Sequence, residues 1–173
     1  MTGEWVLLSY RLPREPSAPR VALWRRLKRL GVAQVLDGLV ALPADARTRE
    51  QLDWAADDVI ERGGTAHVWL ARPASVAQER DLARAMAADR AAEYVELEST
   101  VVQALGAPPA ERRKVVAKAR RAIREVRRRD FFPPGERDRA QAALSRLERS
   151  LDEPPGADAD AASATRAVAR GES

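Results

Sequence analysis

The sequence predicts an α+β protein, in which a domain of four strands and two helices precedes a bundle of helices. Three observations support this prediction. Strand-like and helix-like segments alternate through residues 1–73. Turn signals separate them, among them the pairs Asp37-Gly38 and Gly63-Gly64. Beyond residue 74 apolar residues recur only at helical spacing, so no further strand is expected.

The first strand and helix are predicted within residues 5–31. Residues 5–10 form a short apolar run rich in strand-forming side chains. Several prolines follow and separate this run from the next element. Ser17 is the expected N-cap of a helix that has Pro19 in its first turn, and Gly31 is the expected stop. The apolar side of this helix consists of Leu23, Trp24, Leu27 and Leu30.

A hairpin, a second helix and a fourth strand complete the first domain. Asp37-Gly38 lies between short strands over residues 32–36 and 39–42, which predicts a two-residue type I′ turn. A helix over residues 44–62 and a strand over residues 65–71 follow. The inner side of that helix is expected to hold Leu52, Ala55, Ala56, Val59 and Ile60. The order of elements is that of a ferredoxin-like βαββαβ sheet domain, expected over residues 1–73.

Residues 74–152 are predicted to form an all-α helical bundle, with helices over residues 75–105, 110–129 and 136–151. Arg90 interrupts the apolar stripe of the first of these helices. We expect it to pair with a carboxylate or to stack on an aromatic ring, with ligand binding as the alternative. Residues 153–173 have little to bury and are expected to be a disordered tail.

The composition narrows the possible functions. The 173-residue chain has a formal charge of +4 and a pI near 10.1, which favours anionic partners, although a GC-rich genome also enriches arginine. It has no cysteine and one histidine, which excludes disulfides and multi-histidine metal centres. No apolar run approaches the length of a membrane span, and the first strand is not a signal peptide. We therefore expect a cytoplasmic protein without membrane contact, cofactor or metal.

Catalytic groups are not evident, and we expect no enzymatic activity. His67 beside Trp69 in the fourth strand is expected to be structural. The pairs Asp57-Asp58 and Glu93/Glu96 have the chemistry to bind a hard cation, but such pairs are common on helix surfaces. The periodicity places the four tryptophans, Trp5, Trp24, Trp54 and Trp69, in the core or at an interface. Trp69 is alternatively a dimer contact.

Two helices concentrate positive charge, which suits an anion and above all nucleic-acid phosphate. The alternative is that these faces are solvated, or that the second helix is neutralised by Glu93, Glu96 and Glu98. The candidate nucleic-acid or anion-binding residues are Arg20, Arg25, Arg26, Lys28, Arg29, Arg113, Lys114, Arg120, Arg121, Arg124 and Arg128.

Four features together resemble the N-terminal domain of the ChrB family of chromate-resistance regulators. They are residues 5–31, the hairpin ending in Leu42-Pro43, the Glu93-Tyr94 helix, and the Arg-Asp-Phe-Phe-Pro turn of residues 129–133. The resemblance spans about residues 5–151. It implies a cytoplasmic protein linked to transcriptional control of chromate resistance, with the basic helix of residues 20–29 in the DNA-contacting region.

The first seventy residues also resemble the sheet domain of PaaX-type repressors and the small ferredoxin-like subunit of CRISPR adaptation complexes. Two departures limit the functions that these resemblances imply. Larger ChrB members carry a C-terminal sensory domain, where this chain ends in a tail. Nuclease-like relatives place an aspartate at the end of the first strand, where this chain reads Ser9-Tyr10-Arg11. Metal-dependent nuclease activity is therefore not implied.

Two main hypotheses remain open. The first is a non-enzymatic, DNA-associated transcriptional regulator that acts as a homodimer. The second is a sensor or accessory protein that binds an oxyanion, chromate or sulfate, without binding DNA, because clustered guanidinium groups suit a tetrahedral dianion. Hydrolysis of nucleic acid is a third and weaker hypothesis. Chromate reduction lacks an electron source, since the chain has neither thiols nor a recognisable cofactor motif.

Overall fold

The computed structural model describes residues 3–152. Every expected element is present, with its ends within two residues of the predicted ones. The elements are β1 (Trp5–Arg11), α1 (Ala18–Leu30), β2 (Ala33–Leu36), β3 (Leu39–Pro43), α2 (Ala46–Glu61), β4 (Thr65–Ala71), α3 (Val76–Gln103), the short 3₁₀ helix η1 (Ala104–Gly106), α4 (Pro109–Arg127) and α5 (Glu136–Asp152).

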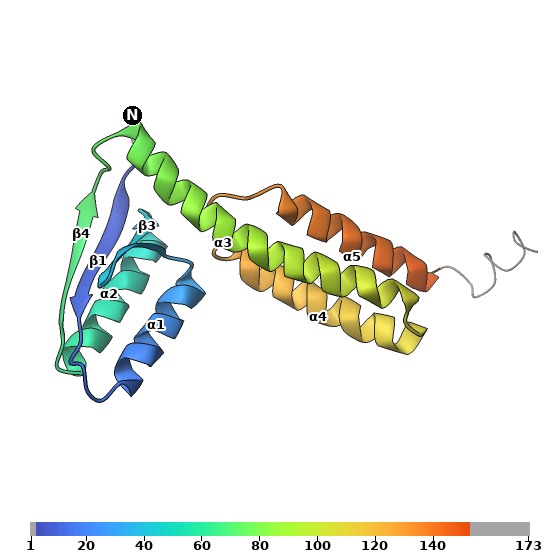
Figure 1. Ribbon diagram of the computed structural model, residues 1–173, viewed down its shortest axis with the longest axis horizontal. Helices are drawn as coiled ribbons and strands as arrows, with labels where there is room; N and C mark the ends of the chain where they lie inside the picture. The colour runs from blue at the N-terminus through green and yellow to red at the C-terminus, as the bar shows by residue number, and fades with distance from the viewer. Residues whose placement is uncertain (1–2, 153–173) are drawn as a thin grey trace, which may run out of the picture. The chain divides into compact units, whose positions relative to one another are not determined.

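The four strands form one sheet in the order β2-β3-β1-β4, and all three neighbouring pairs are antiparallel. Helices α1 and α2 cover one face of this sheet (Figure 1). Within residues 3–152 the protein is therefore a mixed α/β structure, with a four-stranded antiparallel sheet and five α-helices. None of these helices has an apolar stretch long enough to cross a membrane.

The described chain divides into two compact units. The first contains residues 3–93 and 125–135, and the second contains residues 94–124 and 136–152. Both α3 and α4 run from one unit into the other. The division at residue 73 remains a prediction, and the predicted tail over residues 153–173 lies outside the described residues.

The core of the first unit lies between the sheet and its two helices. Leu8 and Leu42 are fully buried in the central strands, and Leu23, Leu27 and Leu52 meet them from α1 and α2. These positions follow the two-residue period of a strand and the 3.6-residue period of a helix. The periodic apolar positions therefore become the core of the sheet unit.

The β2–β3 hairpin differs from the predicted turn type. Gly38 has a φ of 75°, but no non-glycine residue between 3 and 152 has a positive φ, so the turn is not type I′. The Gly38 carbonyl accepts a hydrogen bond of 2.7 Å from the Tyr10 N–H, and a Cβ at Gly38 would lie 2.5 Å from the Tyr10 oxygen. A register shift between Gln34 and Leu36 accommodates the altered turn.

A capping box begins α2. The Thr48 N–H donates to Asp45 Oδ1 at 2.7 Å, and the Asp45 N–H donates to Thr48 Oγ1 at 2.9 Å. The bond from the Thr48 backbone lowers the pKa of the Asp45 carboxyl. The Thr48 hydroxyl also donates to the Pro43 carbonyl at 2.7 Å, which fixes the start of α2 against the end of β3.

Of the four tryptophans, which periodicity placed in the core or at an interface, one is a core residue. Trp5 is buried and its ring stacks on Phe132 at 6.0 Å between centroids. Trp24, Trp54 and Trp69 are 51%, 55% and 55% exposed. In α1 and α2 the buried positions are filled by neighbouring leucine and alanine residues, so each indole lies beside the apolar stripe. Ile60, expected on the inner side of α2, is also exposed for the same reason.

The second unit is an antiparallel arrangement of three helices. The C-terminal part of α3 lies beside α4 and α5 (Figure 1). Val101, Ile123, Leu144 and Leu147 are buried between them. Arg112 of α4 donates to the Ser150 carbonyl at 2.8 Å, which adds a polar tie between α4 and α5.

Candidate anion-binding surfaces

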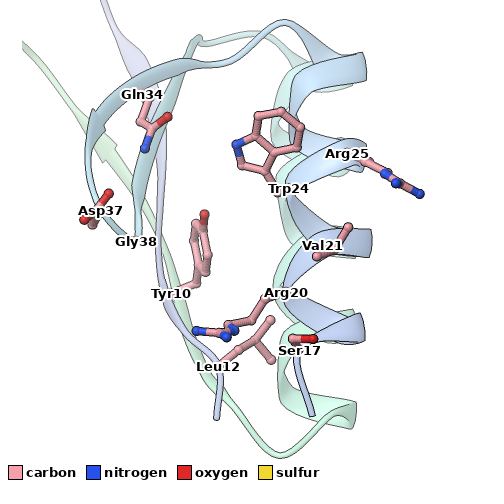
Figure 2. Close-up of a pocket in the computed structure, with 10 residues that line it drawn as sticks. All are labelled: Tyr10, Leu12, Ser17, Arg20, Val21, Trp24, Arg25, Gln34, Asp37 and Gly38. Carbon is pink, nitrogen blue, oxygen red and sulfur yellow. The ribbon is translucent and has the colours of Figure 1, made fainter. Parts of the chain in front are cut away.

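The basic residues of helix α1 lie outside its buried face. Leu23 and Leu27 face the core, while Arg20, Arg25 and Arg29 are exposed. Figure 2 shows Arg20 directed toward the strands and Arg25 directed away from them. The helix carries five basic and no acidic side chains, the remaining two being Arg26 and Lys28. Lys28 forms an ion pair with Asp89 at 3.8 Å and lies 5.6 Å from the Trp24 ring centroid.

Helix α4 is the second basic surface. It carries eight basic and two acidic side chains, a net charge of +6, whereas α5 carries four of each. Arg113, Arg121 and Arg124 are exposed. The other predicted residues form ion pairs: Lys114 with Glu111 at 2.9 Å, Arg120 with Glu148 at 2.7 Å, and Arg128, just beyond α4, with Glu125 at 3.6 Å. The hydrogen bond to Glu111 raises the pKa of Lys114.

Seven predicted residues form no ion pair with any residue between 3 and 152. We call them the unpaired arginines: Arg20, Arg25, Arg26, Arg29, Arg113, Arg121 and Arg124. The acidic residues of α3 were the expected alternative partners of α4. Instead, Glu93 binds Arg90 and Arg129, and Glu98 binds Arg139 of α5. The four unpaired arginines of α1 belong to the first unit, and the three of α4 belong to the second.

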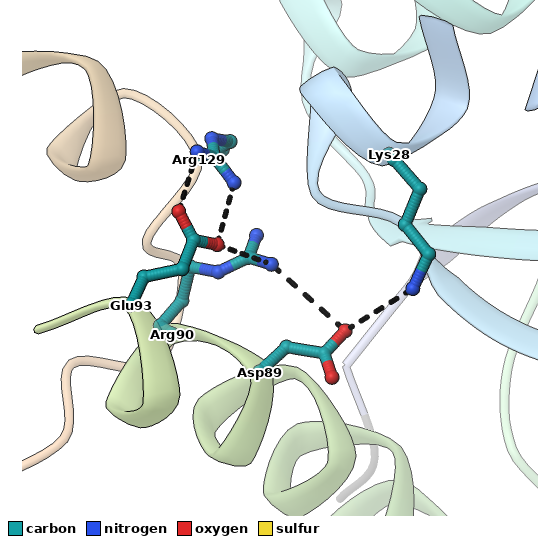
Figure 3. A network of polar contacts seen from close by, with 5 residues as sticks. All are labelled: Lys28, Asp89, Arg90, Glu93 and Arg129. Atoms are coloured by element: carbon teal, nitrogen blue, oxygen red, sulfur yellow. Dashed lines mark hydrogen bonds and ion pairs between the residues drawn. The ribbon is translucent and has the colours of Figure 1, made fainter. Parts of the chain in front are cut away.

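A polar network in the first unit holds Arg90 and Arg129 in ion pairs (Figure 3). Arg129 makes a bidentate pair with Glu93, at 2.7 and 2.6 Å. Arg90, which is 5% exposed, pairs with the same carboxylate at 3.0 Å. Asp89 joins Arg90, at 3.9 Å, to Lys28 of α1. The expectation that Arg90 pairs with a carboxylate is confirmed.

Gly31 lies directly against this network. Its φ is 76°, as expected of a helix stop. A Cβ added there would lie 2.8 Å from Arg90 Nη1 and 2.9 Å from the Arg129 carbonyl oxygen. The end of α1 thus requires a residue without a side chain for two reasons, and only the conformational one was evident from the sequence.

A pocket of about 400 Å³ in the first unit brings four arginines together. We call it the four-arginine pocket. Its lining consists of Arg29, Leu30, Arg47, Gln51, Glu125, Arg128 and Arg129. Arg47 donates to the Arg128 carbonyl at 3.1 Å, and its guanidinium lies 5.6 Å from the Phe131 ring centroid. Arg47 and Arg129 were not among the predicted site residues, because no sequence spacing relates them to α1.

The four-arginine pocket keeps an excess of positive charge. Glu93 neutralises Arg129, and Glu125 pairs with Arg128. Arg29 and Arg47 have no carboxylate partner among the described residues. Two guanidinium groups therefore remain for an anion that enters this pocket.

No group of three or more histidine, cysteine or acidic side chains within residues 3–152 is placed to hold a metal ion. His67 is exposed on β4, with its ring 6.1 Å from that of Trp69. The Trp69 indole N–H donates to Ser9 Oγ at 3.1 Å across the neighbouring strand.

The fold and these surfaces define a mixed α/β protein with two basic helices. Residues 20–103 match the family described as Protein ChrB, N-terminal, which confirms the resemblance drawn from the sequence. The chain is also similar to Protein ChrB of Cupriavidus metallidurans, at 29% identity over 152 residues. That similarity covers 86% of this chain and 46% of the relative, so the chain spans about half of the relative's length. No solved structure matches the chain significantly.

Replacing Glu93 by Gln should destabilise the first unit by about 2 kcal/mol, because Arg90 is left buried without a full negative charge. The matched control is Glu125→Gln, which breaks the exposed pair with Arg128 and should cost less than about 0.5 kcal/mol. Urea unfolding followed by tryptophan fluorescence measures both. Equal midpoints for the two variants would show that the network does not stabilise the unit.

Proposed function

We propose that this chain is a non-enzymatic, DNA-associated regulator in the control of chromate resistance. The similarity to ChrB supports the regulatory role related to chromate resistance. The observation that supports DNA contact is the set of seven unpaired arginines on two helices. A charged side chain without an internal partner keeps its full attraction for a phosphate, whereas a paired one must first be separated from its carboxylate.

We also propose that the first unit has a ferredoxin-like fold. The order of elements, β-α-β-β-α-β, and the strand order β2-β3-β1-β4 support a ferredoxin-like arrangement of the sheet unit.

We also propose a cytoplasmic homodimer. Trp69 and Leu70, which are 55% and 50% exposed on the edge strand β4, support a contact between copies at this edge.

The proposed mechanism is neutralisation of phosphates. Each arginine that meets a phosphate displaces a condensed counterion, so affinity falls as salt rises. Such contacts position a protein on the duplex and carry no base sequence of their own. The net charges of α1 and α4, +5 and +6, favour these two helices over the neutral α5 as the phosphate-contacting elements.

Arg121→Ala combined with Arg124→Ala should weaken binding to a duplex fragment regardless of its sequence. The slope of log affinity against log salt should become shallower by about two, one for each lost phosphate contact. Fluorescence anisotropy over a salt titration measures both quantities.

The matched control is Arg146→Ala combined with Arg149→Ala, which removes the same charge from exposed positions of α5. We expect the control to keep the slope of the parent chain. If the α4 variant and the α5 variant lose the same amount, net charge rather than the α4 surface governs binding. If the α4 variant binds unchanged, phosphate neutralisation by this helix is wrong.

The four-arginine pocket supports a second candidate function, binding of a tetrahedral oxyanion such as chromate or sulfate. Its volume admits a small dianion, and Arg29 and Arg47 are available to bind it.

Arg47→Gln should lower the affinity for sulfate and chromate at least fivefold, because one of the two uncompensated guanidinium groups is lost. Arg49→Gln, an exposed position on the same helix that pairs with Asp53 at 3.9 Å, is the control and should bind as the parent chain does. Isothermal titration calorimetry measures the affinity. Absence of both binding heat and thermal stabilisation in the parent chain would reject the oxyanion function and leave DNA binding untouched.

A further inference from the structure

A second hollow in the first unit lies apart from the four-arginine pocket. It occupies the space between the first two turns of α1 and the β2–β3 hairpin, with a volume of about 560 Å³ (Figure 2). We call it the α1 groove. A volume of this size is typical of sites for small organic molecules. Its lining differs from that of the four-arginine pocket, because most of it is apolar.

The apolar wall of the α1 groove is built from both sides. Val21 and Trp24 come from α1 and are 46% and 51% exposed, while Tyr10 and Leu12 come from β1 and the residues after it and are half-buried. Figure 2 shows the Tyr10 and Trp24 rings between the helix and the strands. An indole left this exposed inside a concave surface has apolar area that a bound ring would cover.

A smaller hollow of about 40 Å³ shares Tyr10, Trp24 and Gln34 with the α1 groove. It reaches the core residue Met86 and the Lys28–Asp89 ion pair. The two hollows are therefore adjacent, and Trp24 borders both.

The polar groups of the α1 groove favour an anion at its open end. Arg20 has no ion pair among the described residues, and Figure 2 shows its guanidinium directed toward Tyr10 and Leu12. Burial, and secondarily the charge of Asp37, raises the pKa of the Tyr10 hydroxyl, which therefore stays protonated and able to donate a hydrogen bond. Asp37 lies at the hairpin tip and Gln34 on the facing strand.

We propose that the α1 groove binds a small planar aromatic molecule that carries one anionic group, such as an aromatic carboxylate. The ring stacks on Trp24 between the helix and Tyr10, and the anionic group pairs with Arg20. A guanidinium and an indole in one concave site match the two ends of such a molecule. This proposal shares Arg20 with the arginines proposed to contact DNA, but it uses neither α4 nor the four-arginine pocket, and it is tested without DNA.

The direct test is a titration of the full chain with 2-naphthoate, followed by NMR of the tryptophan indole N–H groups. We expect the Trp24 indole signal to shift with saturation while the signals of Trp54 and Trp69 stay in place. The Trp24 signal is assigned by its loss in Trp24→Phe. The titrated sample is the parent chain, and Trp24→Phe serves only to assign the signal. No saturable shift, or equal shifts of all three exposed indoles, would overturn the proposal.

Variants separate the stacking from the charge. Trp24→Leu should weaken 2-naphthoate binding about fivefold or more, whereas Trp54→Leu, an equally exposed tryptophan outside the groove, should leave it unchanged. Arg20→Gln should weaken binding of 2-naphthoate but not of the neutral 2-naphthylmethanol, and Arg26→Gln, which removes the same charge from a residue of α1 that does not line the groove, should affect neither. Equal effects of Arg20→Gln and Arg26→Gln, or saturable binding only of single-stranded oligonucleotides, would contradict the proposed ligand class.

Discussion

The carboxylate of Glu93 holds two guanidinium groups, and the arrangement of charge in the first unit depends on it. Arg90 is buried, and a buried guanidinium without a carboxylate would carry a large desolvation cost. Arg129 approaches the same carboxylate in bidentate geometry, with its backbone packed against Gly31. The residues after α4 are thereby fixed within the sheet unit at the end of α1.

This constraint sorts the arginines of a strongly basic chain into two kinds. Those bound by Glu93, Glu125 or Glu148 have their charge already compensated. The unpaired arginines of α1 and α4 have no such partner among the described residues, so their charge acts on whatever approaches the surface. The proposed role in DNA binding rests on this distinction rather than on the overall charge of the chain. The four-arginine pocket contains both kinds, because Arg29 is unpaired while Arg129 is held.

Much of the fold follows from local sequence signals, and the sites follow from them only partly. Periodicity, proline and glycine located every strand and every α-helix within residues 3–152, because each of these signals acts within one turn or one hairpin. The predicted turn type at Gly38 was wrong, because a hydrogen bond with Tyr10 and a shifted strand register determine the turn. Trp24 was placed with Leu23 and Leu27 on the apolar side of α1, because spacing does not tell which apolar residue of a stripe meets the sheet. Arg47 was missed because its neighbours in the four-arginine pocket come from distant segments.

Chemical modification of arginine by phenylglyoxal, read by mass spectrometry with and without duplex DNA, tests the role of the unpaired arginines most directly. We predict that Arg25, Arg29, Arg121 and Arg124 react readily in the protein alone and are protected when DNA is added. Arg90 and Arg129 should react slowly in both cases, and Arg146 and Arg149 should react equally in both. Bound DNA that leaves the unpaired arginines as reactive as before, or that protects the arginines of α5 to the same extent, would contradict this role.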